Sequence, residues 1–205
     1  MSVTVPVGVD DLDTRERLVR AATEVFLERG YGGTRVQDIA RRAGYTSGAL
    51  YQHFPSRTAL LAEAISHAGL SIMEELIEVV SGVRPGESAV ALALAHFGTA
   101  STTPVDRLLL EALALASGDA ESRTALADAM DRLSRRLGEQ VDRARSTGLI
   151  VADVDTEALC MVFTSWLLGT VVLKAVGFRQ VSTERYLAIN QLLLAGLTPV
   201  AVPGN

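Results

Sequence analysis

The chain is poor in the residues and motifs on which many enzymes and secreted proteins depend. Its 205 residues include one cysteine, Cys160, which excludes an internal disulfide and suits a reducing cytosol. The first thirteen residues lack the basic start and apolar core of a signal peptide, so we expect a cytoplasmic protein. There is no G-x-G-x-x-G, P-loop or G-x-S-x-G sequence, and the three histidines lack metal-ligand spacing. These absences argue against an enzyme and leave no candidate site for a metal or cofactor.

Strand signals are equally scarce, and apolar residues recur at helical spacing along most of the chain. Beyond residue 55, proline, glycine and small polar residues interrupt this pattern at several points. The uninterrupted stretches predict helices at about 56–81, 87–101, 105–117, 120–146, 155–176 and 183–196. The sequence therefore predicts an all-α fold, with a disordered tail over residues 1–13 and a second tail over 199–205.

Residues 34–57 have the pattern of two short helices joined by a tight turn. Thr34 and Gln37 fit a capping box, in which each side chain bonds the other's backbone N–H, so a helix should start near Arg35. Apolar residues then recur at helical spacing until Gly44, which lacks a Cβ and suits a helix end. This arrangement is typical of the helix-turn-helix, which places its second helix in the major groove of DNA.

The second of these helices is expected to have a buried face and an open face. Thr46 or Ser47 can cap its start. The positions that point back to the core are Ala49, Leu50 and Phe54. The other side carries Ser47, Gly48, Tyr51 and His53. A helix is also expected before this pair, because an apolar stripe follows a cap-like start at Asp13. Ser56 can cap a further, long helix after it, so the sequence predicts a three-helix unit followed by a long connecting helix.

Three motifs in this region resemble the tetracycline-repressor (TetR/AcrR) family of bacterial transcription regulators. They are AA-x-x-x-F-x-x-x-G-Y over 21–31, T-x-V-x-x-I-A-x-x-A-G over 34–44 and G-x-L-Y-x-H-F over 48–54. The resemblance runs from about Thr14 to Ile65, roughly a quarter of the chain. It implies an N-terminal helix-turn-helix DNA-binding domain over 14–60 and a C-terminal helical ligand-binding and dimerisation domain over 61–198.

The charge of the chain is divided in a way that fits these two domains. Residues 14–60 hold eight arginines and four carboxylates, a net charge of +4, in a chain whose net charge is −5. The remainder therefore carries −9. A basic region on an acidic protein directs one surface toward phosphate and keeps the rest away from it.

The resemblance also implies which residues contact DNA. The phosphate contacts would be made by Thr34, Arg35, Tyr51, His53 and Arg57. The residues nearest the base edges would be Thr46, Ser47, Gly48 and Ala49. Because Gly48 and Ala49 have no polar side chain, readout there would be by close approach and methyl contact. Tyr45 would lie at the protein–DNA boundary.

A stretch of sixteen residues without a charge, 158–173, lies between Glu157 and Lys174. It is apolar on nearly all sides, but it is slightly shorter than a membrane-spanning helix, which needs about twenty apolar residues. We therefore expect a buried helix and no membrane partner. With 183–196 it predicts a four-helix bundle between two copies, with contacts from Phe163, Gly169, Thr170, Leu173, Tyr186 and Leu193. A homodimer would let two recognition helices read both halves of a palindromic site on double-stranded DNA.

The middle helices would enclose a small, largely apolar effector. Candidate lining residues are His96, Phe97, Met130, Leu133, Leu137, Phe163, Trp166 and Leu167, each of which would also serve as an ordinary core residue. The chain is thus predicted to be a repressor that an effector releases from its operator by tilting the helix at 56–81. A rival interpretation is a helical small-molecule binding or scaffold protein with a vestigial DNA module.

Overall fold

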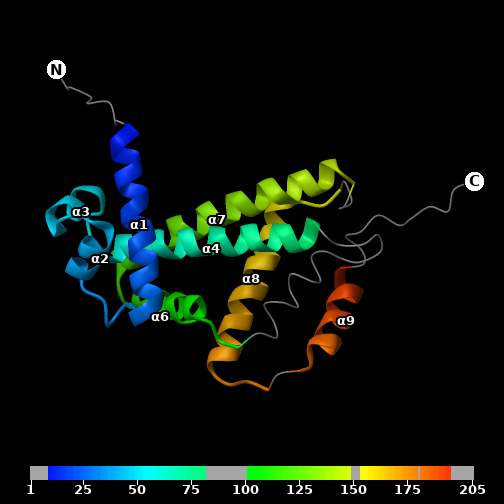
Figure 1. Cartoon of the computed structure of the whole chain (residues 1–205). Helices are drawn as coiled ribbons and strands as arrows, with labels where there is room; N and C mark the ends of the chain where they lie inside the picture. Colours follow the sequence, from blue (N-terminus) through cyan, green and yellow to red (C-terminus); the bar gives the residue numbers. More distant parts are fainter. Residues whose placement is uncertain (1–8, 82–100, 149–152, 180, 195–205) are drawn as a thin grey trace, which may run out of the picture. The chain divides into compact units, whose positions relative to one another are not determined.

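Helices make up most of the computed structural model, which describes residues 9–81, 101–148, 153–179 and 181–194 (Figure 1). The N-terminal helices are α1 (Val9–Arg29), α2 (Val36–Ala43), α3 (Ser47–His53) and α4 (Arg57–Ser81). Further along the chain are α6 (Pro104–Gly118), α7 (Ala120–Ser146), α8 (Thr156–Ala175) and α9 (Thr183–Leu194). The described ranges contain no strand, which confirms the prediction of an all-α fold.

The predicted bounds of the long helices agree with the observed ones, except at the start of the chain. The ends of α4 and of α6 to α9 fall within about two residues of expectation. The helix predicted at 87–101 lies almost entirely outside the described residues. In contrast, α1 begins at Val9, four residues before the expected cap at Asp13, so residues 9–13 are helical and not a disordered tail. The sequence favours this, because acidic residues in the first turn of a helix stabilise it through the helix dipole and Asp13 lies close to the start of α1.

The chain divides into two compact units. One holds the chain up to Ala68 together with Pro104–Met130, and the other holds the rest. The division expected at residue 60 therefore differs from the division by packing, because the first part of α4, the whole of α6 and the first part of α7 pack with the N-terminal helices. Helices α4 and α7 each continue from one unit into the other.

The core of the N-terminal unit is formed by apolar faces of α1, α2, α3 and α4, which lie together in Figure 1. Helix α1 contributes a buried stripe of Leu18, Ala21, Ala22, Val25 and Phe26. The other three helices contribute Ile39, Ala40, Leu50, Phe54, Leu60 and Leu61, each at most 2% exposed. Each large side chain buried in this way stabilises the unit by roughly 1.5–3 kcal/mol. The hydroxyl of Thr23 donates to the carbonyl oxygen of Val19 at 2.9 Å and lies 3.4 Å from that of Ala64, which places α1 against α4.

The turn between α2 and α3 is set by a glycine and a cap. Gly44 has φ of 80°, the left-handed conformation that its missing Cβ tolerates, and its N–H donates to the carbonyl oxygen of Arg41. Thr46 then accepts a hydrogen bond from the N–H of Ala49 at 3.2 Å. Both features confirm the sequence-based expectations, and together they fix where α3 begins.

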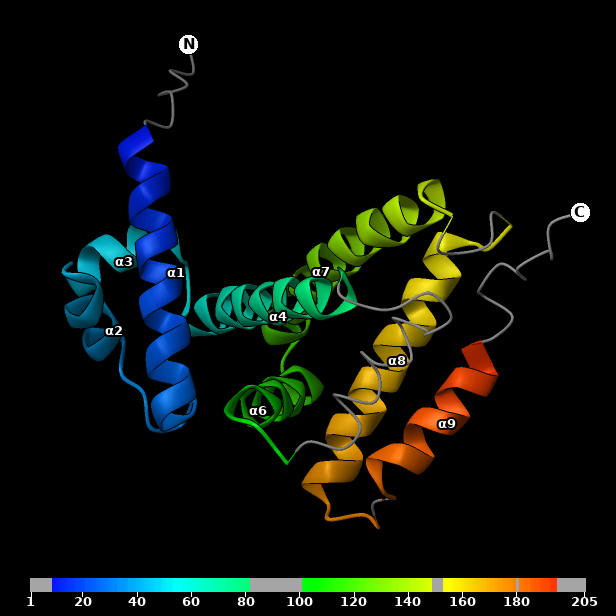
Figure 2. The ribbon, with the colours of Figure 1, turned by 45° about the vertical axis from the view of Figure 1, so that its right-hand side comes forward.

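Helices α8 and α9 both belong to the C-terminal unit (Figure 2). A small core around Cys160 includes Val141 and Leu159 and is flanked by partly buried apolar side chains. Among the helices of the described ranges, α8 is long and apolar enough to cross a membrane, yet only 17% of its apolar window is buried within the structure. A helix that packs on another protein chain has the same length and composition.

Candidate DNA-binding surface

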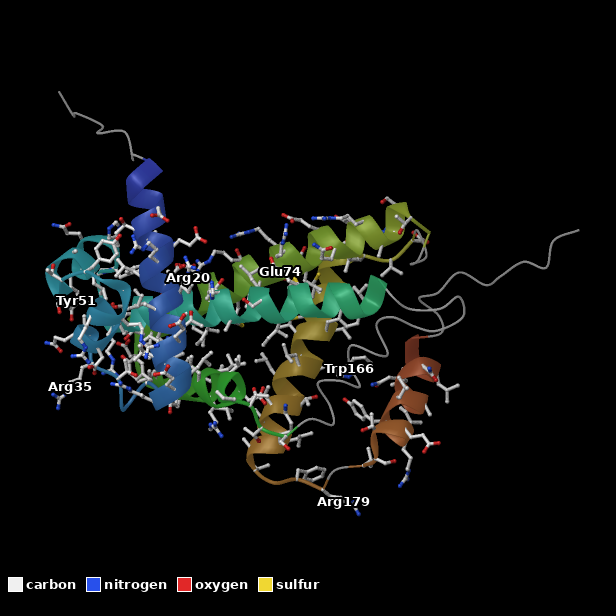
Figure 3. The ribbon with its side chains drawn as sticks, viewed as in Figure 1. Arg20, Arg35, Tyr51, Glu74, Trp166 and Arg179 are labelled. Atoms are coloured by element: carbon white, nitrogen blue, oxygen red, sulfur yellow. The ribbon has the colours of Figure 1, made fainter. Side chains whose placement is uncertain are left out.

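Helix α3 presents one face to the core and the other to solvent. Leu50 is fully buried, whereas Gly48, Tyr51 and Gln52 are exposed. These three positions have the spacing i, i+3, i+4, so they form one strip along the helix, which we call the α3 strip. Tyr51 is 51% exposed, and Figure 3 shows it with Arg35 on the side of the unit formed by α2 and α3.

The other residues predicted to lie near the base edges border this strip. Thr46 is exposed, and Ser47 and Ala49 are half-buried. At Gly48 the backbone has no positive φ, and a Cβ built there would meet only the hydroxyl oxygen of Thr46, at 3.8 Å. Neither strain nor crowding therefore requires glycine at a position where alanine favours the helix more. The open space beside Gly48 allows another molecule to approach the helix backbone closely.

Thr34 was expected to contact phosphate through its backbone N–H, but this N–H donates to the carbonyl oxygen of Tyr31 at 3.3 Å. The side chain of Thr34 is 1% exposed, and its hydroxyl donates to the carbonyl oxygens of Gly30 (2.7 Å) and Val25 (3.4 Å). The expected capping box with Gln37 is absent, and the N-cap of α2 is Arg35, whose side chain makes no capping bond. The loop after α1 brings Thr34 to the end of that helix, where carbonyl oxygens lack intrahelical partners and compete for the hydroxyl.

Tyr45 is half-buried and contacts the N-terminal half of α1. Its hydroxyl lies 3.2 Å from the hydroxyl oxygen of Thr14. The guanidinium carbon of Arg17 lies 5.3 Å from the centre of its ring, within the range of a cation–π interaction. Tyr45 therefore holds the turn that precedes α3 against α1.

The last two predicted phosphate contacts, Arg57 and His53, lie partly inside the unit. The guanidinium carbon of Arg57 lies 3.9 Å from the ring centre of Tyr31, and its Nε and Nη2 atoms are buried without a hydrogen-bond partner. With these two atoms inside the unit, Nη1 is the nitrogen best placed for an outside acceptor, and the phosphate clamp at Arg57 stays a prediction. His53 is half-buried, with its ring 6.3 Å from that of Phe54.

Most arginines of the N-terminal helices are paired with carboxylates. Arg42 donates through both terminal nitrogens to Glu28, at 3.0 and 2.9 Å, and also to Glu24 at 3.0 Å. The hydrogen bonds from Arg42 lower the pKa of Glu28. Further ion pairs are Arg29–Asp38, Arg41–Asp38, Arg15–Glu63 and Arg17–Asp13. Arg35 is exposed and has no such pair among the described residues, so its charge is available to a phosphate.

A long-range contact that no sequence pattern indicated joins α6 to the end of α1. Oε2 of Glu111 accepts a hydrogen bond from the backbone N–H of Tyr31 at 2.5 Å. The adjoining Gly30 has φ of 71°, and a Cβ there would come within 3.0 Å of Oε1 of Glu111. The two partners are eighty residues apart in sequence. Helix α6 thereby holds the loop that leads into α2.

The residues predicted to line an effector site are mostly engaged in packing. The methyl groups of Leu133 would lie 2.9 Å from a Cβ built on Gly69, so α7 crosses α4 closely there. Leu137 and Phe163 pack on the cluster around Cys160. Met130, Trp166 and Leu167 are half-buried, and His96 and Phe97 lie outside the described residues. Described residues line two hollows, one beside Arg145 and one beside Ser122, and neither hollow includes a predicted lining residue.

Helices α8 and α9 carry an exposed apolar face. Leu173 and Leu193 are 47% and 62% exposed, and Gly169 is exposed with open space around it. Thr170 and Tyr186 are half-buried, and Phe163 packs on the protomer's own core, which removes it from this face. The other large apolar side chains exposed on these two helices are Met161, Val162, Val172, Val176, Ile189 and Leu192. Large apolar side chains exposed in such number indicate an interaction surface.

The N-terminal helices match a known family. Residues 18–64 fit the sequence profile described as bacterial regulatory proteins, tetR family. The HTH-type transcriptional repressor DhaR of Mycobacterium sp. (strain GP1) is 51% identical over 45 residues, which cover 22% of this chain and 23% of DhaR. The chain spans about a quarter of the length of the first curated relatives that it matches. The names of these relatives describe HTH-type transcriptional regulators.

Solved structures share the fold over nearly the whole chain. The TetR family transcription regulator SCO0332 has a TM-score of 0.66 and 24% identity, with 91% of this chain and 100% of that one covered. The transcriptional regulator FadR from Bacillus subtilis, solved in complex with stearoyl-CoA, has a TM-score of 0.56 and 19% identity, with 89% and 98% covered. At these identities the similarity concerns the fold alone.

Proposed function

Because residues 18–64 match the tetR family of bacterial regulatory proteins and nearly the whole chain shares the fold of such regulators, we propose that the protein is a cytoplasmic, homodimeric repressor that binds a palindromic operator. In this proposal α3 enters the major groove of DNA, and a small, largely apolar effector releases the protein from the operator. The protein requires no metal or cofactor and no membrane for this activity.

The observation that carries the DNA-binding proposal is the α3 strip. Burial of Leu50 and the cap at Thr46 support a fixed orientation of this helix, with Gly48 and Tyr51 on its open side. The Tyr51 hydroxyl and the Arg35 guanidinium supply phosphate contacts, which set the register of the protein on the duplex. The bases lie against Thr46, Ser47, Gly48 and Ala49, and Gly48 lets the groove edge come close to the helix.

The proposed cover for the exposed apolar face of α8 and α9 is a second copy of the chain. Ser165 and Gly169 lie between Met161 and Val172 on the exposed side of α8, at the spacing of successive helical turns. Small residues at these positions allow two α8 helices to approach closely. A two-fold dimer then presents two α3 helices about 34 Å apart, the distance between successive major grooves on one side of DNA.

The proposed effector acts on α3 through helices that belong to both units. It binds in the C-terminal part of the chain, for which Met130, Leu133, Leu137, Trp166 and Leu167 remain candidate neighbours. The complex of FadR with stearoyl-CoA supports a small-molecule effector for this fold. Tilting of α4 would change the spacing of the two α3 helices, and a tenfold loss of operator affinity requires about 1.4 kcal/mol of differential effector binding.

Substitution at Gly48 tests the DNA-binding surface without weakening the fold. The operator is first isolated by selection of bound fragments from random DNA, and affinity is then measured by mobility shift. Gly48→Ala should raise the melting temperature slightly, because alanine favours a helix by up to about 1 kcal/mol over glycine, and a Cβ has open space there. The same Cβ should obstruct the groove and lower operator affinity at least about tenfold.

Gly118→Ala is the matched control, since Gly118 is an open glycine of the same unit on α6. It should leave operator affinity unchanged. Equal affinity for the wild-type protein and Gly48→Ala would contradict the proposed surface. The rival scaffold function predicts that the wild-type protein binds DNA without sequence preference or not at all, whereas a regulator binds one palindrome with a steep dependence on salt.

A further inference from the structure

Helix α3 contains one side chain that can read a base through two parallel hydrogen bonds. Its sequence is Ser-Gly-Ala-Leu-Tyr-Gln-His, and Gln52 is its only carboxamide. A carboxamide holds a donor and an acceptor side by side, which is the pattern that complements N6 and N7 of adenine in the major groove. The hydroxyls of Ser47 and Tyr51 offer one oxygen each and discriminate less between bases.

Gln52 is placed for this role by the α3 strip. It is exposed, directly follows Tyr51 and lies four residues after Gly48, so its side chain leaves the same side of the helix as these two. The distance along the helix axis from Gly48 to Gln52 is about 6 Å, which corresponds to roughly two base-pair steps. A groove edge that approaches α3 at Gly48 therefore brings a neighbouring base pair within reach of Gln52.

The fold makes no use of the Gln52 carboxamide. Within the described residues no hydrogen bond reaches this side chain, although polar groups close to it in sequence have structural partners. The hydroxyl of Thr46 caps α3, and the hydroxyl of Tyr45 bonds that of Thr14. Stability of the N-terminal unit therefore does not account for glutamine at this position.

We propose that Gln52 determines operator specificity by reading one adenine in each half-site. Its Nε2 donates to N7 of the adenine, and its Oε1 accepts from the N6 amino group. This inference rests on the proposed DNA-binding function and adds to it, because Arg35 and Tyr51 contact phosphate and carry no sequence information themselves. Gly48 provides the close approach, and Gln52 provides the choice of base.

The test is a selection from random DNA with the full-length protein and with two variants of Gln52. The wild-type protein should select a palindrome with an A·T pair at one fixed position of each half. Gln52→Ala should lose that preference alone, with a fall of about 5- to 150-fold in discrimination per half-site. Gln52→Glu should shift the preference toward cytosine, because a carboxylate accepts from the N4 amino group of that base.

Gln37→Ala is the matched control, because Gln37 is exposed on α2, the helix that crosses the DNA backbone in this motif. It should leave every base preference unchanged. Identical base preferences for the wild-type protein and Gln52→Ala would overturn the inference, as would an affinity loss that is equal for all sequences, which identifies a phosphate contact. A wild-type protein that selects no palindrome would instead refute the proposed function, so the two failures are distinguishable. Melting curves verify that each variant is folded.

Discussion

The N-terminal helices bury most of their large apolar side chains, whereas α8 and α9 expose many of theirs. Of the large apolar side chains that are exposed in the described part of the chain, one, Tyr51, belongs to the N-terminal unit, and ten lie between Met161 and Val176 or between Phe178 and Leu193. The N-terminal unit thus buries its apolar surface within one protomer. Helices α8 and α9 leave theirs exposed, so under the proposed dimer the first set of residues determines stability and the second determines assembly.

The largest expected effect comes from the core of the N-terminal unit. Leu50→Ala removes a side chain that is fully buried, and should lower the free energy of unfolding by roughly 2–5 kcal/mol. Denaturant unfolding followed by circular dichroism measures this loss, which should be independent of protein concentration. Leu192→Ala is the comparison, because Leu192 is 73% exposed and its loss should cost about 0.5 kcal/mol or less in dilute protein. An equal loss of unfolding free energy in the two variants would contradict the proposed difference between the two regions.

Substitution at Gly169 should break assembly while leaving the protomer folded. Gly169→Arg places a long charged side chain in open space on α8, so the protomer should keep its melting temperature at low concentration. Sedimentation should show monomers, and operator affinity should fall at least about tenfold because each monomer reads one half-site. Gly118→Arg adds the same side chain at an open glycine of α6 and should remain dimeric. A dimeric Gly169→Arg protein would place the interface elsewhere.

A smaller effect is expected at the contact between α6 and the end of α1. Glu111→Gln replaces a charge-assisted hydrogen bond to the Tyr31 N–H by a neutral one, which should cost about 1 kcal/mol. Hydrogen exchange at the Tyr31 amide should become faster. Glu16→Gln, an exposed change on α1, serves as the control and should leave that exchange rate as it is. An unchanged rate in Glu111→Gln would show that the contact contributes nothing to the stability of the loop.

The smallest expected effect is a dependence on pH. The hydrogen bonds from Arg42 lower the pKa of Glu28 below 4.5 in the folded protein. A carboxyl with a lowered pKa stabilises the fold above its unfolded pKa, and this contribution is lost as the pH falls through the folded value. The melting temperature of the wild-type protein should therefore fall slightly more steeply below about pH 4.5 than that of Glu28→Gln. Parallel curves would mean that this exposed pair does not stabilise the unit.

Local rules predicted much of the fold because most helix ends in this chain are decided by adjacent residues. Gly44 ends α2 and Thr46 caps α3 as expected. The hydroxyl of Ser56 accepts from the N–H of Ala59 at 3.0 Å, which confirms the predicted cap of the fourth helix. The helical period also correctly predicted that Leu50 is buried and that Tyr51 is exposed.

The remaining errors arise where several partners compete for one group. The spacing of Thr34 and Gln37 satisfies a capping box, but the carbonyl oxygens at the end of α1 are nearer and win the hydroxyl. The Tyr31 ring offers Arg57 a packing surface that only the folded chain brings close, and the sequence did not indicate it. The bond from Glu111 was missed for the same reason, because no periodic pattern relates residues so distant in sequence.

The hydrogen bond from Glu111 ends on the main chain of Tyr31 and not on its side chain. Every amino acid except proline has this N–H, so mutation at position 31 can change the size and charge of the loop without removing the bond. Substitutions of the Tyr31 side chain should therefore leave the link from α6 in place. Proline is the exception at this position, because it lacks the N–H from which Glu111 accepts.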